Sequence, residues 1–242
     1  MGLWWLIALQ TISARVPSPP EVIEAIERDF TSIRALEYVL FTTGGIYQNL
    51  LYTIENVLIG VSIGTAIGFP LGVLIGRVRL ARDLLEPPLL VLGTVPVVML
   101  LPFLTMWFGT ARIAQNGLVI FYAALTVAVV AQQATLNVAG RFEQYATSLG
   151  AGQGRILGRV ILPAIVPEVL GAVRASLAAG WGFETVAEIL GAPNGAGRLI
   201  QVFSVAVMTP DIIGVLICVG VVAVLIDAVV AAAGSWVVRW QE

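Results

Sequence analysis

The sequence is divided into apolar runs of about twenty residues, and this pattern constrains the fold more than any other feature. The hydrocarbon core of a bilayer is about 30 Å thick and is crossed by roughly 20 helical residues. Charged residues make up 12% of the 242 residues, about half of the share usual in soluble domains. Strands of a membrane barrel would alternate apolar and polar residues over about 10 positions, and the sequence shows no such alternation. We therefore predict an all-α polytopic membrane protein.

The positions of these runs predict about six crossings of the membrane. The first segment, residues 1–14, is too short to span by itself and is expected to form only part of a helix. The five longer runs cover residues 50–76, 88–108, 113–135, 163–188 and 211–238. If successive spans cross the membrane in alternate directions, seven arginines fall in segments inside the cell and five in segments outside it. This bias follows the positive-inside rule, so both termini are expected in the cytoplasm.

Two shorter segments are apolar on one side only. Residues 18–42 follow a proline-rich break and carry Val22, Ile26 and Phe30 at helical spacing, with glutamates between them. This amphipathic pattern predicts a helix that lies on the extracytoplasmic surface of the membrane. The segment 199–207 is predicted to form a shorter amphipathic or re-entrant helix.

Glycines mark one face of the run at residues 50–76. They are Gly60, Gly64, Gly68 and Gly72, spaced by four residues. Residues four apart lie on the same helix face, and small residues on one face let another membrane helix approach closely. The spacing therefore predicts a tight helix–helix contact.

The composition argues against an enzyme. The chain has no histidine, and all of its 13 positively charged residues are arginines. Without lysine or histidine the chain lacks Schiff-base chemistry, a Ser-His pair and the Gly-x-x-x-x-Gly-Lys loop that binds ATP. Cys218 is the single cysteine, so no disulfide forms within the chain. A facing pair of Glu184 and Asp227, as in an intramembrane aspartyl site, has no support in the sequence. We predict no catalytic residues, no metal site and no cofactor bound by this chain.

Three charged residues within the predicted spans are candidates for a pathway through the membrane. Charges inside membrane spans are costly and by default suggest function. Arg174 is the one positive charge near a pathway, with an ion pair between helices as the structural alternative. Glu184 and Glu188 lie four apart on one helix face near the outer end, where simple exposure to solvent is the alternative.

The polar stretch 141–162 interrupts two apolar runs and is the candidate functional segment. Gly150 breaks it into two helix-compatible halves, and apolar residues in the second half follow helical spacing. We predict two short helices joined at this glycine, parallel to the membrane on its cytoplasmic side. Helices this short are unstable alone, so they need a docking partner; a merely long loop is the alternative.

This stretch resembles the cytoplasmic loop in the permease subunits of binding-protein-dependent ABC importers. The motif of that loop is Glu-Ala-Ala, three residues, Gly, nine residues, Ile-x-Leu-Pro. With the motif glycine on Gly150, Leu162 and Pro163 fall in register and Val160 takes the isoleucine position. Gln144 stands where the motif has glutamate. The residues that the resemblance assigns to ATPase coupling are Gln144, Tyr145, Ala146, Gly150, Ala151, Val160, Leu162 and Pro163.

The resemblance extends over nearly the whole chain. The segments 17–19, 107–109, 187–192 and 239–240 are similar to the branch that imports nitrate, sulfonates, taurine and bicarbonate. It implies the type I importer permease fold, with six helices and a cytoplasmic coupling helix, in a bacterial inner membrane. It also implies a small, anionic solute delivered by an extracytoplasmic solute-binding protein.

The resemblance implies partners that this chain does not itself contain. Two ABC ATPase subunits would bind ATP and magnesium, and a second permease chain would complete the pathway. A copy of the same chain is the first expectation for that second permease, with a distinct permease as the alternative. A secondary carrier or channel that works without an ATPase is the alternative function.

Overall fold

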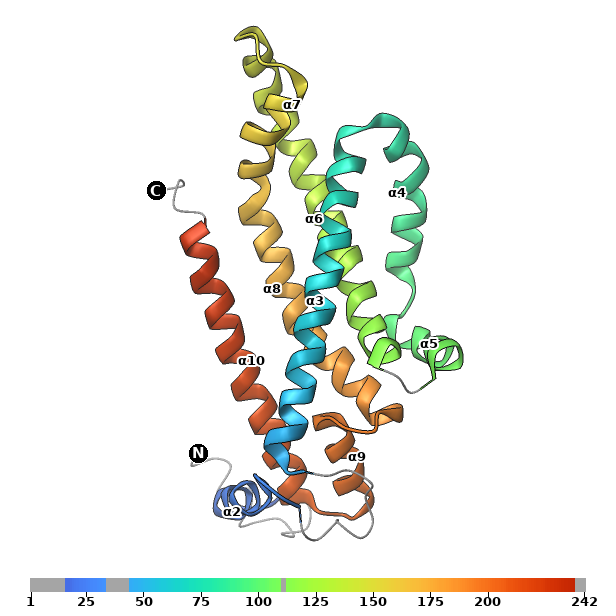
Figure 1. Ribbon diagram of the computed structural model, residues 1–242, viewed down its shortest axis with the longest axis vertical. Helices are drawn as coiled ribbons and strands as arrows, with labels where there is room; N and C mark the ends of the chain where they lie inside the picture. Colours follow the sequence, from blue (N-terminus) through green and yellow to red (C-terminus); the bar gives the residue numbers. More distant parts are fainter. Residues whose placement is uncertain (1–15, 34–43, 110–111, 238–242) are drawn as a thin grey trace.

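The computed structural model describes residues 16–33, 44–109 and 112–237. In these ranges the chain is helical throughout, apart from short connections (Figure 1), as the apolar runs predicted. The helices are α2 (Pro19–Asp29), α3 (Ile46–Arg77), α4 (Arg79–Thr94), η2 (Val97–Leu100), α5 (Leu101–Phe108), α6 (Arg112–Ser148), α7 (Gln153–Ile156), η3 (Leu157–Ile161), α8 (Leu162–Gly191), α9 (Ala196–Val205) and α10 (Thr209–Val237). The expected partial helix at residues 1–14 lies outside the described residues.

The long helices α3, α6 and α8 form the centre of the molecule (Figure 1). The glycine face of α3 packs against α6, which confirms the predicted close contact. A Cβ atom on Gly68 would lie 2.3 Å from the carbonyl oxygen of Ala124, and one on Gly72 would lie 2.3 Å from that of Ala128. Only glycine permits this approach, because any side chain would meet the backbone of α6.

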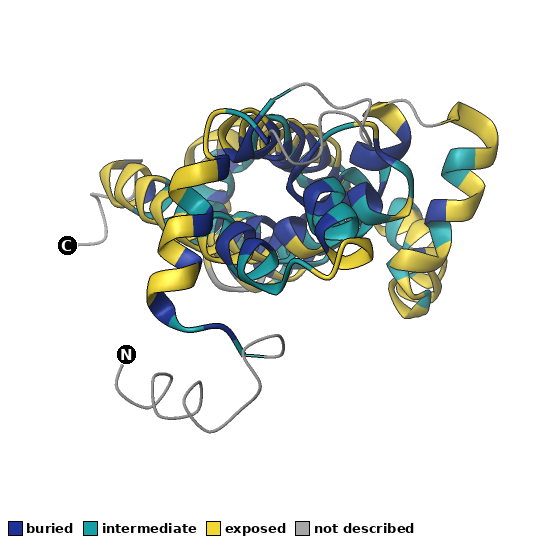
Figure 2. Ribbon diagram, turned by 90° about the horizontal axis from the view of Figure 1, so that it is seen from below, coloured by how far each residue is buried: buried dark blue, intermediate teal, exposed yellow. Residues whose placement is uncertain are grey.

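Buried residues face the centre of this bundle, and exposed residues cover its outer faces (Figure 2). Helix α10 is strongly apolar, yet only 11% of its most apolar 18-residue stretch is buried within the chain. Apolar residues exposed on such a helix are expected where lipid or another membrane protein covers it.

The segment expected to be a single span at residues 88–108 is instead bent. Helix α4 ends at Thr94, and η2 and α5 continue at an angle of 95° to it. Pro96 explains the break, because proline disfavours helical geometry in the residue before it; Val95 accordingly has an extended backbone with ψ of 126°. In the described residues four helices are long and apolar enough to cross a membrane, or five if the bent pair forms one span.

Helices α2 and α9 lie at the end of the bundle near the start of α10 (Figure 1). Helix α2 begins where the sequence predicted the surface helix, and the Glu21 carboxylate accepts a hydrogen bond of 3.0 Å from the Ser18 backbone N–H. It ends at Asp29, and the predicted continuation falls partly on residues 34–43, which lie outside the described residues. The predicted short helix at 199–207 corresponds to α9.

Candidate functional site

The polar stretch at 141–162 forms the tip of a long helical hairpin at one end of the molecule (Figure 1). Helix α6 continues to Ser148, and after a short turn α7, η3 and α8 run back as one helical rod. This differs from the expected pair of short helices joined at a glycine. The first half of the stretch is the end of α6, and the second half is the start of the rod that becomes α8.

The turn of the hairpin depends on Gly150, which has a φ of +81°. The backbone N–H of Gly150 donates to the carbonyl of Thr147 (2.9 Å), and that of Ala151 donates to the carbonyl of Ala146 (3.0 Å). These two bonds define the Schellman motif that commonly ends a helix at a left-handed glycine. Gly150 is therefore required by the backbone, since no side-chain atom lies within 4 Å of the position its Cβ would occupy.

The two arms of the hairpin are joined by an apolar core. Ala134 and Val138 of α6 pack against Ile156, Ile161 and Ile165 of the returning rod. The two alanines at the turn, Ala146 and Ala151, pack against the same cluster. This burial explains why α6 does not end at the predicted boundary near residue 135.

An ion pair ties the hairpin to the end of α3. The Arg77 guanidinium donates to the Glu143 carboxylate at 2.9 Å and to the Gln153 side-chain oxygen at 2.5 Å. The hydrogen bond from Arg77 lowers the pKa of Glu143 below its usual range. Glu143 thus serves contacts within the chain, whereas Gln144, one position later, is exposed.

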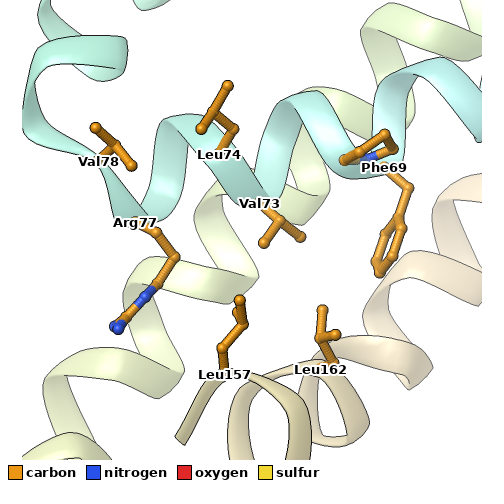
Figure 3. A pocket seen from close by; sticks show the side chains of 8 residues that line it. Phe69, Val73, Leu74, Arg77, Val78, Leu157 and Leu162 are labelled. Carbon is orange, nitrogen blue, oxygen red and sulfur yellow. The ribbon is translucent and has the colours of Figure 1, made fainter. Parts of the chain in front are cut away.

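An apolar cavity of about 380 Å³ lies between α3 and the returning rod. Figure 3 shows Val73 and Leu74 of α3 with Leu157 and Leu162 of the rod at its wall. Arg77 lies at its edge. Leu162 therefore has a role within the chain, because it contributes to the packing that positions the hairpin.

Pro163 begins α8 and follows a π-helical turn at Leu157–Ile161. Proline lacks a backbone N–H and its ring clashes with the carbonyl four residues earlier, which here belongs to Arg159. A wider π-helical turn relieves such crowding without breaking the rod. Val160 lies in this turn and is half-buried.

The hairpin exposes a row of large apolar side chains at the end of α6 and on the residue that follows it. The row consists of Phe142, Tyr145 and Leu149, which are 49%, 73% and 87% exposed. Their spacing of three and four residues places them on one helix face. Tyr145 is among the residues that the resemblance assigns to coupling, whereas Phe142 and Leu149 are not; their shared face with Tyr145 follows only once α6 extends this far.

The candidate pathway residues Glu184 and Glu188 have no exposed surface in the described structure. Asn56 donates to Glu184 at 2.8 Å. Glu188 accepts hydrogen bonds from the Thr53 hydroxyl (2.8 Å) and from the Gly197 backbone N–H (2.8 Å). The alternative of solvent exposure is therefore wrong, and in this conformation both carboxyls lie inside helix packing that joins α3, α8 and α9.

Arg174 forms an ion pair with Asp227 of α10. Its Nε donates to Asp227 Oδ1 at 2.9 Å and its Nη2 donates to Oδ2 at 2.7 Å. Unlike the two glutamates, these side chains remain 46% and 41% exposed. The ion pair between helices, given as the structural alternative for Arg174, is present, and the pathway role of this residue stays a prediction.

Comparison with known proteins identifies relatives over nearly the full length. Residues 68–242 match the family described as binding-protein-dependent transport system inner membrane component. A probable ABC transporter permease protein of Brucella abortus is 30% identical over 100% of this chain and 92% of that protein. The taurine transport system permease protein TauC of Escherichia coli is 26% identical over 94% of this chain and 81% of that protein.

The fold is also similar to a solved structure. The chain matches an inward-facing structure of the MetNI methionine ABC transporter with a TM-score of 0.65 and 20% sequence identity. The match covers 87% of this chain and 99% of the chain in that structure. The predicted type I importer permease fold is thereby confirmed.

Proposed function

The chain belongs to the family of binding-protein-dependent transport system inner membrane components, and on this premise we propose that the α6–α8 hairpin is the surface through which ATP drives its transport cycle. As an ABC importer permease it is a membrane transport subunit, and ATP is hydrolysed by a separate partner. Its family implies both an ATPase and a solute-binding protein as partners.

The observation that supports this proposal is the row formed by Phe142, Tyr145 and Leu149. A water-exposed apolar row at the tip of a hairpin is typical of a protein–protein contact. An amphipathic helix commonly binds a groove through residues spaced by three, four and seven positions. We propose that this row enters a groove of the ATPase, with the hairpin in the cytoplasm.

Most of the other residues that the resemblance assigns to ATPase coupling would hold this row in place. Ala146, Gly150 and Ala151 form the turn, while Val160, Leu162 and Pro163 shape the returning rod; Gln144 adds an exposed amide beside the row. Because α6 and the rod pass into the bundle without a break, movement of the hairpin tip would tilt both helices. ATP binding in the partner subunits would in this way alternate access to the two sides.

We further propose the composition of the complex and the class of its solute, which membership in the family does not specify. The complex would contain two ATPase subunits and a second permease chain, a copy of this chain, in a bacterial inner membrane with both termini in the cytoplasm. The solute would be small and anionic or partly anionic, such as a sulfonate, taurine or nitrate, because TauC transports taurine by its name.

Alanine substitution of the apolar row tests the coupling proposal. We expect Tyr145→Ala or Leu149→Ala to weaken binding of the ATPase by about 2 kcal/mol, or roughly thirty-fold, as truncation of central interface residues often does. Co-purification of the tagged permease with its ATPase measures the loss. The matched control is Leu190→Ala, which removes an exposed leucine (62%) near the far end of α8. Equal ATPase recovery in the Leu149 and Leu190 variants would refute the assignment.

A further inference from the structure

The ion pair between Arg174 and Asp227 lies deep within two helices that are long enough to span the membrane. Arg174 is in the middle third of α8, and Asp227 is in the middle third of α10. The neighbouring Val173 packs against two apolar clusters, one that includes Val127 and Ile165 and one that includes Val61 and Trp181, so this level belongs to the apolar centre. A charged group at this depth is costly in contact with lipid, and such groups face a bundle interior or a water-filled path.

The surface around Arg174 differs from a lipid-facing surface. The exposed face of α8 at this level carries only small residues besides the arginine: Gly171, Ala175, Ala178 and Gly182. On α10, by contrast, large apolar side chains are exposed: Val224, one turn before Asp227, at 69%, and Leu225 and Val229, on the face opposite Asp227, at 60% and 69%. The small-residue face of α8 therefore leaves space beside the ion pair, while the outer face of α10 has the large side chains that suit lipid.

A cavity of about 240 Å³ lies on one side of Arg174, which lines it, whereas Asp227 lies outside its lining and reaches it only through its contact with Arg174. Arg174, Gly171 and Leu170 line it from α8, and Ala231, Gly234 and Ser235 line it from α10. Pockets for drug-sized ligands measure roughly 300–1,000 Å³, so this one suits a solute of few heavy atoms.

The chemistry of the pair favours one class of solute. Arginine has five N–H donors, and the contacts with Asp227 use Nε and Nη2, so among the described residues Nη1 has no hydrogen-bond partner and can bind a second anion. The Asp227 carboxylate keeps lone pairs for a cation. A solute with a single negative charge would meet repulsion from Asp227, and a solute with a single positive charge would meet repulsion from Arg174. A solute with one group of each sign satisfies both.

We propose that Arg174 and Asp227 form a transient binding site for a small zwitterionic solute on the translocation pathway. The anionic group of the solute binds the guanidinium and its ammonium group binds the carboxylate. This assignment rests on the proposed function, within which it selects an amino-sulfonate type of solute over a simple anion such as nitrate.

Thiol labelling of the permease–ATPase complex tests whether this face meets water. In a Cys218→Ala background, Gly171→Cys places a thiol beside the pair, where an added Cβ has no neighbour within 4 Å. We expect methanethiosulfonate reagents with either a quaternary ammonium or a sulfonate group to label it. Leu225→Cys is the control: two residues from Asp227 it points nearly opposite on the helix, and we expect no labelling. If neither reagent labels the cysteine at position 171 or the one at position 225, the proposal is overturned.

The charge of the pair then predicts which reagent and which solute are favoured. In the Gly171→Cys protein, Asp227→Asn should accelerate the sulfonate reagent and slow the ammonium reagent several-fold, and Arg174→Gln should do the reverse. Taurine at millimolar concentration should protect the thiol better than isethionate, which carries a hydroxyl in place of the ammonium group. Asp227→Asn should abolish that preference. Equal protection by taurine and isethionate, or protection by neither, would contradict a zwitterion site.

The same variants separate this proposal from the coupling proposal. An ion pair that only stabilises the fold would lower the protein yield in both the Asp227→Asn and the Arg174→Gln variant without opposite shifts in reagent preference. ATPase recovery, measured on the same preparations, depends on the hairpin and not on Arg174. Loss of ATPase binding in the Leu149→Ala variant therefore tests the coupling surface alone, whatever the outcome of the labelling.

Discussion

Gly150 shows at the residue scale how a single backbone angle sets the end of the hairpin. With φ of +81° it occupies the left-handed region, which costs an L-residue roughly 1–2 kcal/mol. Gly152, two positions later, has φ of −74° and ψ of 156°, an extended conformation open to any residue. Neither glycine has an atom within 4 Å of an added Cβ. The two positions therefore differ in backbone strain and not in space.

We predict that Gly150→Val impairs coupling more strongly than Gly152→Val. The strain of roughly 1–2 kcal/mol should loosen the turn and displace the apolar row, whereas valine at position 152 fits the backbone. ATPase activity stimulated by the loaded binding protein, measured in the reconstituted complex, reports the difference. The prediction fails if both variants keep the same stimulation.

Glu188 is a second residue whose role depends on its buried surroundings. We predict that Glu188→Ala destabilises the protein by about 1–3 kcal/mol, because it leaves the buried Gly197 N–H without its acceptor; the Thr53 hydroxyl keeps the Asn49 carbonyl as an acceptor at 3.2 Å. Thermal unfolding of the detergent-solubilised protein measures the loss. Glu55→Ala is the control, since Glu55 and Arg112 form an exposed pair that is worth about 0–1 kcal/mol; an equal loss in both would contradict the role given to Glu188.

At the scale of elements, the contact between α3 and α6 determines the bundle. The glycines of α3 meet small residues and backbone carbonyls of α6 along the whole contact, from Val119 beside Gly60 to Thr135 beside Gly76. Membrane helices gain little from hydrophobic burial against each other, so close packing of small residues carries much of their association. The glycine spacing in α3 thus matches the positions at which α6 comes closest, so its effect depends on both helices.

We predict that Gly68→Ala disrupts this contact, although it adds only one methyl group. That methyl would lie 2.3 Å from the carbonyl oxygen of Ala124, so the helices must separate, at a cost of about 1–3 kcal/mol. Gly93→Ala in α4 meets nothing within 4 Å and should be neutral or slightly stabilising, since alanine favours helices by about 1 kcal/mol over glycine. The yield and thermal stability of the solubilised protein compare the two; similar behaviour would disprove the packing argument.

At the scale of the whole molecule, the hairpin and the exposed ion pair lie in different parts of one bundle. The hairpin reaches out from one end, while Arg174 and Asp227 lie midway along α8 and α10. Since α8 continues the rod that starts in the hairpin, it connects the two places mechanically. If the proposed contact with the ATPase forms at the hairpin, α8 would carry its movement to the proposed solute site.

We predict that liposomes containing this chain alone do not accumulate solute, and that uptake needs the ATPase, ATP and the binding protein together. A substitution of the Walker lysine in the ATPase should abolish uptake while the complex still co-purifies. Uptake of labelled taurine measures the effect. Accumulation by the chain alone would instead indicate a secondary carrier, the alternative left open by the sequence.

The class of the protein and its closest helix–helix contact follow from the amino-acid sequence alone. The apolar runs required membrane helices, the glycines of α3 required a close neighbour, and Gly150 marked a break in the polar stretch; the assignment of this stretch to ATPase coupling came from its resemblance to the importer motif and stays a prediction. These features are local patterns of one helix or one turn, and such patterns are readable without a partner helix.

Only the tertiary structure decided how these pieces combine. Apolar packing of Ala134 and Val138 against Ile156, Ile161 and Ile165 carries α6 past its predicted end, and so replaces two surface helices with a hairpin. Glu184 and Glu188 are buried by contacts with α3 and α9, while Arg174 finds Asp227 53 residues away and stays exposed. Whether a charge is buried, paired or open depends on neighbours distant in sequence, which no local pattern specifies.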